Sequence, residues 1–507
     1  MNTMHPKLVA TMPIKPSLAT LDALSKTVSV PNYARADLSP GIVHIGVGNF
    51  HRAHMAVYLD RLFNQGFDHN WAIIGGGLKH YDAAMRAKLE AQDWLTTIIE
   101  LDPKGRSAAV TGAMIDFTNT TPDALVASLV RPEIRIVSLT ITEGGYFVNA
   151  LTGGFDTLHP EVMADAAAPY APQTVFGVLI KALLARSAAG EKPFTILSCD
   201  NLPENGHVTE ASVLGLAALQ DQLHGTKNAT WIKANVAFPN SMVDCITPAT
   251  GPREIAFAAD HFGIADAAPV TCEPFRQWVL EDKFPQGRPR FELVGAEFVK
   301  DVAPYELMKL RILNAGHAII AYPAGILGIH FVHDAMANPL IAKFLGWLLH
   351  KELIPTVPAI AGVDFEEYYQ KIVERFSNAE VGDTIPRLCL DGSNRQPKFI
   401  LPAVHDRLRD GLPVDGLALE VALWCRFCAG IDEDGQALNV PDNSAARLTD
   451  YAIKARKTPN VFLQQEAIFG TLSEAKPFAG AFEKALDDIW ARGLVRVLED
   501  AVDGHKT

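Results

Sequence analysis

GIVHIGVGNFHRAH, residues Gly41 to His54, is the stretch that decides the fold of this chain. Ile42 to Ile45 is a short apolar run rich in β-branched residues, which predicts a β-strand. The glycine turn Gly46-Val47-Gly48-Asn49 follows, and a helical pattern runs from Ala53 to Phe63. Strand, glycine turn and helix form the setting in which backbone N–H groups receive a pyrophosphate. The G-x-G-x-x-G fingerprint is incomplete, because His51 stands where the third glycine belongs, so an ordinary strand–helix turn is the alternative.

A second apolar run, Trp71 to Ile74, predicts the next strand, which ends in Gly75-Gly76-Gly77. A dinucleotide site needs an acid near the end of this strand, because a carboxylate accepts a hydrogen bond from the ribose 2′-hydroxyl and repels a 2′-phosphate. Asp82 is the candidate, although Lys79 and His80 beside it could instead meet a phosphate. The sequence therefore favours NAD over NADP.

Three more apolar strands are predicted, and polar residues follow the carboxyl end of each. The strands and these residues are Ile134 to Thr142 with Glu143, Phe194 to Ser198 with Asn201, and Ala234 to Phe238 with Asp244. Helical segments such as Thr174 to Ser187 and Val208 to Gln222 separate them. This alternation implies a mostly parallel sheet, whose ligands gather at the carboxyl ends of its strands. The three polar residues are thus site candidates, with turn or cap roles as the alternative.

Helical periodicity replaces the strand signal after about Gly295. We therefore predict a Rossmann-type, mostly parallel α/β domain over residues 1–295 and a mainly helical domain over 296–507, with a cleft between them. The helices expected in the second domain are Pro304 to Tyr322, Pro339 to Lys351, Asp364 to Phe376, Leu417 to Ala429, Ser444 to Lys454 and Ala481 to Arg492.

The segment from Pro304 to Tyr322 contains KLRILNAGH, Lys309 to His317, and is predicted to line the cleft. Proline is favoured in a first helical turn and stops a helix later on, so one helix should end before the proline that follows Tyr322. At about 100° per residue, Lys309, Asn314 and His317 lie near 0°, 140° and 80°, on one arc. Apolar residues occupy most of the remaining surface, so the helix should be buried.

These three polar residues predict a site for alcohol and carbonyl chemistry. Burial of Lys309 among aliphatic side chains disfavours its charged form, which lowers its pKa and suits it to general-base catalysis. Asn314 offers an amide N–H to a developing alkoxide, and His317 can donate or accept at the same oxygen. The alternative is a lysine that reaches the surface, a capping asparagine and a histidine whose bonds are satisfied in the core.

Composition narrows the class of protein. The 507 residues are 48% hydrophobic and 20% charged, as in ordinary globular proteins, and the net charge of −13 argues against nucleic acid or an anionic membrane as partner. Residues 1–40 are read as an N-terminal arm without a secretory signal. Six scattered cysteines then suggest reduced thiols in the cytoplasm. Cys425 and Cys428 have zinc-ligand spacing, but no second Cys/His pair stands nearby, so two thiols on one helix is the favoured interpretation.

Eight blocks of the sequence together closely resemble the mannitol 2-dehydrogenase family, the long-chain, metal-independent polyol dehydrogenases and their uronate-reducing relatives. The resemblance extends from Gly41 to the final helices, and the K-x4-N-x2-H pattern is its most specific part. The blocks are GIVHIGVGNFHRAH, ITEGGY, SCDN, FPNSMVDCITP, CEPFRQWVLEDKF, KLRILNAGH, RFSN and LCLDGSNRQPKF.

The resemblance implies an NAD-dependent enzyme that interconverts a polyol and its ketose, most simply D-mannitol and D-fructose, without a metal. Lys309 would be the general base, Asn201 and Asn314 the oxyanion hole, and His317 a ligand of the reacting oxygen. Glu143 would gate a water chain between the lysine and solvent. By the same resemblance, the residues that bind the other hydroxyls are Asp244, Arg387 and Arg395, and those that bind the cofactor are Gly46, Gly48, Asn49, Phe50 and Asp82. It also implies a monomer.

The sequence departs from the family pattern at two positions. Arg395 stands where mannitol enzymes can have lysine, which leaves mannitol, sorbitol and arabinitol open as substrates. Tyr81 precedes Asp82 where a second acid can occur, which weakens the case for strict NAD use.

Three rival interpretations remain. Arg387 and Arg395 could clamp the carboxylate of a hexuronate, which would make the chain a fructuronate or tagaturonate reductase of the same family. Tyr305 and Lys309 also match the Y-x-x-x-K pair of short-chain dehydrogenases, but those chains are about half as long. A nicotinamide-binding sensor without catalysis would need Lys309 or Asn201 replaced, and both are present.

Overall fold

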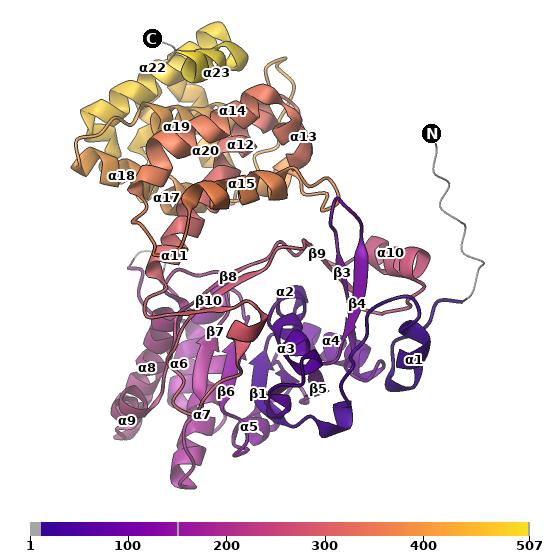
Figure 1. Ribbon diagram of the computed structural model, residues 1–507. Helices are drawn as coiled ribbons and strands as arrows, with labels where there is room; N and C mark the ends of the chain where they lie inside the picture. Colours follow the sequence, from indigo (N-terminus) through magenta and orange to yellow (C-terminus); the bar gives the residue numbers. More distant parts are fainter. Residues whose placement is uncertain (1–11, 150–151, 505–507) are drawn as a thin grey trace. The chain divides into compact units, whose positions relative to one another are not determined.

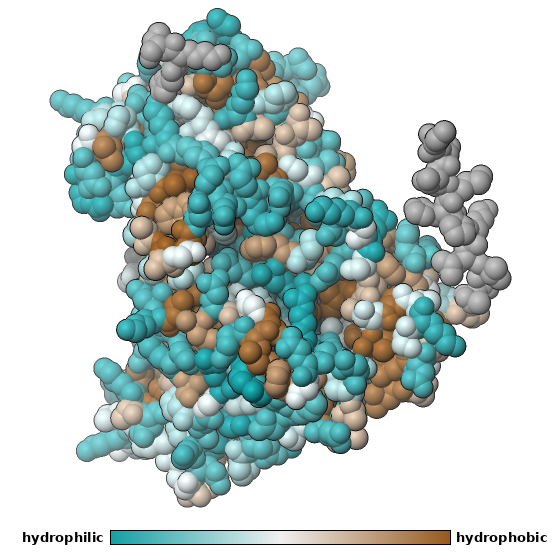
Figure 2. All heavy atoms as spheres, viewed as in Figure 1, coloured by the Kyte–Doolittle hydropathy of each residue, from teal (hydrophilic) through white to brown (hydrophobic). Residues whose placement is uncertain are grey.

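The computed structural model describes residues 12–149 and 152–504, so the first eleven residues of the N-terminal arm predicted over 1–40 lie outside the described part. The chain divides into two compact units, one that ends at Ala303 and one that begins at Pro304 (Figure 1). No helix among the described residues is both long enough and apolar enough to cross a membrane. The face drawn in Figure 2 is mainly hydrophilic, with separate hydrophobic patches.

A five-stranded sheet forms the centre of the first unit, with strand order β5-β2-β1-β6-β7. All four neighbouring pairs are parallel, which confirms the predicted Rossmann-type fold. Ile45 at the end of β1 stands opposite Gly76 of β2 and Leu139 of β6, so these strands end at one edge. The strands are β1 (Pro40–Ile45), β2 (Ala72–Gly76), β5 (Met114–Phe117), β6 (Ile136–Leu139) and β7 (Thr195–Ser198).

Both faces of this sheet are buried, because side chains alternate between two apolar cores. Val43 and Val137 belong to one core, with helices α7 (Val175–Ala188) and α8 (Asn205–His224). Ile42 and Ile136 belong to the other, which includes residues of α3 (Met55–Asn64). Burial on both faces explains why these strands are continuous apolar runs.

The helix predicted over Ala53–Phe63 begins earlier and has a break. Helix α2 (Asn49–Ala53) starts directly after the glycine turn, and α3 follows it. His54 separates the two with φ −115° and ψ −94°, which are not helical angles. The other helices around the central sheet are α4 (His80–Glu90), α5 (Pro122–Leu129), α6 (Pro160–Ala167) and α9 (Asn228–Asn235).

The prediction of a strand at Ala234–Phe238 is wrong. Helix α9 covers the first two residues of that run, and the rest is irregular, although the Ile196 N–H of β7 donates to the Ala237 carbonyl (3.0 Å). Pro239 follows and has no N–H with which to extend a ladder. The strand lies further on, where β8 (Ser241–Asp244) pairs antiparallel with β10 (Gln277–Glu281).

Two smaller three-stranded sheets complete the first unit, and most of their strands were not predicted from the sequence. Their orders are β11-β10-β8 and β4-β3-β9. The strands not yet named are β3 (Thr96–Glu100), β4 (Ser107–Thr111), β9 (Val270–Cys272) and β11 (Glu297–Val299). Helices α1 (Leu21–Leu24) and α10 (Pro252–Phe262) lie near β3 and β4 in Figure 1.

The second unit is helical, as predicted. Its longer helices are α14 (Pro339–Leu348), α15 (Phe365–Phe376), α17 (Gly392–Phe399), α18 (Leu401–Arg409), α19 (Asp415–Cys428), α20 (Ala445–Ala455), α22 (Lys476–Arg492) and α23 (Leu494–Asp503). Short helices are α13 (Val332–Ala337), α16 (Ile385–Leu388) and α21 (Glu466–Phe469). Cys425 and Cys428 both lie on α19 and are buried, free thiols.

The segment predicted as one helix from Pro304 to Tyr322 is three pieces. Helix α11 (Ala303–Met308) leads into a π-helical segment, Lys309–Asn314, and α12 (Ala315–Ile326) follows. Pro323 lies inside α12 and does not end it, contrary to the prediction. The helix is buried almost throughout and packs against α14 and α19, so packing outweighs the one backbone hydrogen bond that proline removes.

Candidate functional site

The turn after β1 is built so that only glycine fits at its first position. Gly46 has φ +95°, and a Cβ there would lie 2.1 Å from the Thr140 carbonyl oxygen, which directly follows β6. The Gly46 N–H donates to the Gly76 carbonyl (3.0 Å), and the Gly48 N–H donates to the Gly46 carbonyl (2.7 Å). The turn is therefore fixed between the ends of β2 and β6.

Asn49 and Phe50 begin α2, and both side chains face protein groups. The Asn49 amide donates to the Pro248 carbonyl (3.0 Å) and to the Thr250 hydroxyl (2.9 Å), and Phe50 stacks on His54 (ring centroids 4.8 Å apart). The first N–H groups of a helix have no intrahelical acceptor, so those of Asn49 and Phe50 are suited to an anion such as a pyrophosphate. The glycine turn and this first helical turn fit a dinucleotide.

Asp82 caps the start of α4. One of its carboxylate oxygens accepts from the backbone N–H groups of Leu78 (3.0 Å) and Lys79 (2.8 Å). The residue is 8% exposed, and burial raises its pKa. Lys79 and His80 are exposed beside it. The candidate for the ribose thus also holds the backbone of the turn after β2.

Asp200 links the chain segments that leave β6 and β7. Its carboxylate accepts from the N–H groups of Ile141 (2.9 Å) and Thr142 (3.0 Å) and from the Tyr146 hydroxyl (2.7 Å). These contacts hold Glu143, the next residue after Thr142, near Asn201, the next residue after Asp200. Glu143 and Asn201 are both exposed.

Asn205, which is buried, attaches β8, the strand that ends in Asp244, to the same region. The Asn205 amide donates to the carbonyls of Asp200 (3.1 Å) and Ser241 (2.7 Å), and its oxygen accepts from the Ser241 N–H (2.9 Å). Asp244 ends β8 and is 6% exposed. Sequence reasoning missed Asp200, Asn205 and Ser241 as supports, although SCDN and FPNS contain two of them.

The π-helical segment changes the angle, around the helix axis, that was predicted between the side chains of Lys309 and Asn314. The Ala315 N–H donates to the Leu310 carbonyl, the i→i+5 bond that defines this geometry. Lys309 and Asn314 are five residues apart. In a turn closed by such bonds, the angle between them around the helix axis is smaller than the predicted 140°. Lys309 is 8% exposed and Asn314 is half-buried. Single π turns within α-helices are frequent at functional sites.

His317 lies on α12 and stacks on Phe376 of α15 (ring centroids 4.4 Å apart, 20° between planes). Its Nε2 has no hydrogen-bond partner within the described ranges. Burial lowers the pKa of His317 well below its usual value, and the charges of four cations lower it further; these are Arg387, Arg375, Arg395 and Lys309, in order of effect. The ring is therefore neutral at pH 7.

The two predicted arginines lie next to each other. Arg387 on α16 forms a two-point ion pair with Asp383. Arg395 on α17 donates to the Leu388 carbonyl (2.9 Å) and the Arg387 carbonyl (3.4 Å), which end α16. Arg375, which is 6% exposed, was missed, although the RFSN block contains it. The second unit thus gathers Lys309, Asn314, His317 and three arginines.

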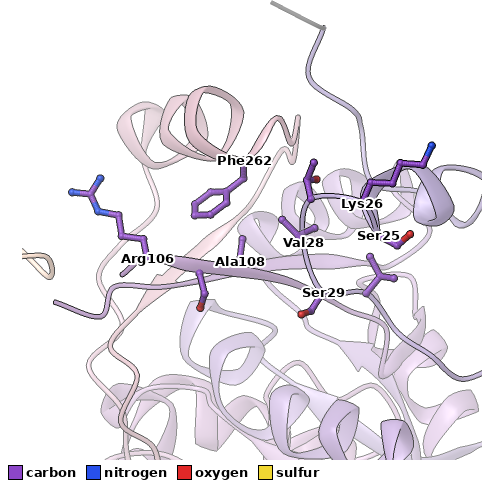
Figure 3. A pocket seen from close by; sticks show the side chains of 10 residues that line it. Ser25, Lys26, Val28, Ser29, Arg106, Ala108 and Phe262 are labelled. Carbon is purple, nitrogen blue, oxygen red and sulfur yellow. The ribbon is translucent and has the colours of Figure 1, made fainter. Parts of the chain in front are cut away.

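A hollow of about 630 Å³ lies on the first unit. Arg106 and Lys26 lie on opposite sides of it (Figure 3). It is lined by the segment Ser25–Val30, by Arg106 to Ala108 and by Phe262, and none of the predicted site residues is among them. Within residues 12–149 and 152–504, no three His, Cys, Asp or Glu side chains are grouped so that they could hold a metal ion.

A Rossmann-type unit followed by a helical unit with a buried lysine, an asparagine and a neutral histidine defines a class: two-domain oxidoreductases. Two family models match the chain, the mannitol dehydrogenase Rossmann domain over residues 40–293 and the mannitol dehydrogenase C-terminal domain over residues 301–490. The chain belongs to the mannitol dehydrogenase family, which confirms the resemblance seen in its sequence.

Three relatives are similar to this chain over nearly its whole length. Mannitol 2-dehydrogenase of Cereibacter sphaeroides is 52% identical over 477 residues, which cover 94% of this chain and 99% of that protein. Pseudomonas fluorescens mannitol 2-dehydrogenase, solved as a ternary complex with NAD and D-mannitol, is 40% identical with a TM-score of 0.85 and covers 97% of this chain and 100% of that one. A substrate-free D-sorbitol dehydrogenase is 34% identical with a TM-score of 0.87 and covers 96% and 100%.

Proposed function

We propose that this chain is an NAD-dependent polyol 2-dehydrogenase that converts D-mannitol and NAD⁺ to D-fructose, NADH and a proton, without a metal. The observation that carries the proposal is the buried amine of Lys309 at the start of a π-helical segment that also carries Asn314. A buried amine near amide and imidazole groups can take a hydroxyl proton and stabilise the alkoxide that forms.

Each polar residue then has a separate role. Lys309, in its deprotonated form, accepts the proton of the substrate hydroxyl, and Asn201 and Asn314 donate hydrogen bonds to the resulting oxyanion. His317, which is neutral at pH 7, binds the same oxygen. Glu143, an exposed residue, controls the passage of the proton to solvent. NAD, when bound, accepts the hydride from the carbinol carbon.

NAD is proposed over NADP on two grounds. The acid Asp82 lies at the start of α4, where its charge disfavours a 2′-phosphate, and the relative from Pseudomonas fluorescens was solved with NAD. The exposed cations Lys79 and His80 act in the opposite direction. Titration of the protein with NADH and with NADPH, followed by nicotinamide fluorescence, tests the preference. Tighter binding of NADPH would reject it.

Asp244, Arg387 and Arg395 are proposed to bind the remaining hydroxyls of the polyol. The relatives include both mannitol 2-dehydrogenases and a D-sorbitol dehydrogenase, so sorbitol and arabinitol are included as slower substrates. A panel of polyols and ketoses with NAD(H) and NADP(H) tests the assignment, with D-fructose expected to be reduced fastest. Full activity after dialysis against EDTA is the expected result for a reaction without a metal, and loss that zinc restores would contradict it.

A hexuronate reductase remains the second candidate. Arg387, Arg375 and Arg395 all act electrostatically on His317, and such a concentration of positive charge favours a carboxylate-bearing substrate. The ion pair of Arg387 with Asp383 reduces that charge, so we place mannitol first. Reduction of fructuronate with NADH at a higher kcat/KM than fructose would reverse the order.

The oligomeric state and the cellular location of the protein are also part of the proposal. We propose a monomer in the cytoplasm, because the family resemblance implies the first and the six cysteines favour the second. Light scattering coupled to gel filtration measures the mass, and a dimer mass would contradict the monomer.

A further inference from the structure

Two histidines lie face to face under the glycine turn. His44 is on β1 and His51 is on α2, and their ring centroids are 3.4 Å apart with 11° between the planes. The side chains are 0% and 1% exposed. His51 occupies the position of the third glycine in the dinucleotide fingerprint, where glycine normally allows the helix to pack closely on the strand. Here the stacked imidazoles fill that space.

His44 joins the turn to the end of β6 through hydrogen bonds. Its Nδ1 lies 2.8 Å from the Ser138 hydroxyl, and its Nε2 lies 2.9 Å from the Thr140 hydroxyl and 3.1 Å from the Gly46 carbonyl oxygen. The Thr140 hydroxyl donates to the same Gly46 carbonyl (2.6 Å). Thr140 therefore accepts from the Nε2–H of His44, which leaves Nδ1 to accept from Ser138.

This arrangement requires a neutral imidazole, and the surroundings provide for one. Burial lowers the pKa of His44 to about 3. Burial also lowers the pKa of His51 well below its usual value, assisted by His44, Arg52 and His54. The pair therefore carries no charge at neutral pH, and its hydrogen bonds keep one direction.

We propose that Thr140, His44 and Ser138 are positioning residues for the dinucleotide. These three residues hold the Gly46 carbonyl in place. The glycine turn and the first N–H groups of α2 then keep the conformation that receives a pyrophosphate. His51, which stands where the fingerprint has its third glycine, supports this function by stacking on His44. The proposal rests on the assignment of the glycine turn to the cofactor. None of the three residues needs to touch the cofactor itself.

Thr140→Val provides the sharpest test, because it removes the hydroxyl and keeps the branched shape. The Thr140 hydroxyl then no longer donates to the Gly46 carbonyl or accepts from His44. We therefore expect the Kd for NADH, measured by fluorescence titration of the whole protein, to rise about tenfold. The KM for ketose at saturating NADH should change less than twofold. Thr140→Ser keeps the hydroxyl and should restore the wild-type Kd within about twofold.

Thr195 supplies a matched control. It is a buried threonine on β7 of the same sheet, and its hydroxyl has no hydrogen-bond partner among the described residues, so Thr195→Val should leave the Kd unchanged. Ser138→Ala is a second, milder variant, for which we expect a rise of about threefold. If Thr140→Val does not fold, the Kd of Ser138→Ala for NADH tests the positioning role instead.

Each outcome bears on the proposal. A wild-type Kd in folded Thr140→Val, or an equal loss in Thr195→Val, would overturn the role of the Thr140 hydroxyl. A lower melting temperature with an unchanged Kd would mean that these bonds support only the fold, which also overturns it. Failure of the wild-type protein to bind NADH would reject the cofactor assignment, and with it the positioning role.

Discussion

The two units hold their candidate site residues by different means. In the first unit, side-chain hydrogen bonds to backbone groups fix the chain beside each residue, as Asp200 does for Ile141 and Thr142 next to Glu143. In the second unit, burial and charge dominate, since Lys309 is 8% exposed and burial and nearby cations lower the pKa of His317. We therefore expect variants in the first unit to disturb geometry and those in the second to change proton chemistry.

Lys309→Ala should produce the largest effect. Loss of the proposed general base is expected to lower kcat for mannitol oxidation by roughly 10³-fold. Asn314→Ala, which removes a proposed oxyanion donor, should lower it less, by about 10²-fold. The variant should also lose the rise of the oxidation rate with pH, because the amine must be deprotonated to accept a proton. Pre-steady-state and steady-state rates across pH measure both effects. Lys343, an exposed lysine on α14, gives the control Lys343→Ala.

Asp200→Ala tests the first unit. Three hydrogen bonds at the ends of β6 and β7 are removed, which should displace Glu143 and Asn201 and lower kcat on the order of tenfold. Asp200→Asn keeps an acceptor oxygen and should lose less. A pH profile of unchanged shape in both variants is expected, because neither alters the proton acceptor. A shifted pH profile of kcat would show that Asp200 also affects proton transfer, contrary to the difference expected between the two units.

The sequence predicted the parts of the fold that depend on continuous apolar runs. Strands β1, β2, β6 and β7 are buried on both faces, so their apolar runs stand out. The run at Ala234–Phe238 is also mainly apolar, but Pro239 follows it and the strand β8 begins only at Ser241. The π-helical turn at Lys309–Asn314 left no trace, because a helix that is apolar nearly all round shows no change of period when one turn widens.

The site was predicted less completely than the fold. Lys309, Asn314 and His317 were proposed because polar residues are few in that helix, and Gly46 because a glycine turn follows a predicted strand there. Their roles in the site stay predictions. Asp200 and Asn205 were missed as supports, since a capping side chain is recognised only when its backbone partners are known. Which residues of the two units act on one substrate stays a prediction.

Glu420 shows how strongly burial acts in the second unit. It lies on α19, is 1% exposed, accepts from the Gln396 amide (2.8 Å), and burial raises its pKa to about 8. The folded protein therefore binds this proton more tightly than the unfolded chain, so the stabilisation that Glu420 contributes is greatest at low pH and falls as pH rises toward 8. Between pH 6 and 8 this group should remove about 2 kcal/mol of the free energy of unfolding.

Glu420→Gln should abolish that pH dependence, because an amide pairs with Gln396 without a proton. Denaturant unfolding of the wild-type protein and of Glu420→Gln at pH 6, 7 and 8 measures it. A wild-type stability that rises between pH 6 and 8 while the Glu420→Gln stability stays level would contradict the direction of the shift.

The smallest effect is expected at Tyr305, which would be the proton donor if Y-x-x-x-K chemistry operated. Tyr305 is 8% exposed and lies on α11, one turn before the π-helical segment. Because Lys309 is the proposed proton acceptor, Tyr305→Phe should keep kcat within about twofold and leave the pH profile of Lys309 intact. A short-chain type of mechanism would instead make the phenol indispensable, with a loss on the order of 10²-fold or more. The ratio of kcat in Tyr305→Phe to that in Lys309→Ala therefore separates the two mechanisms, even if both variants lose some stability.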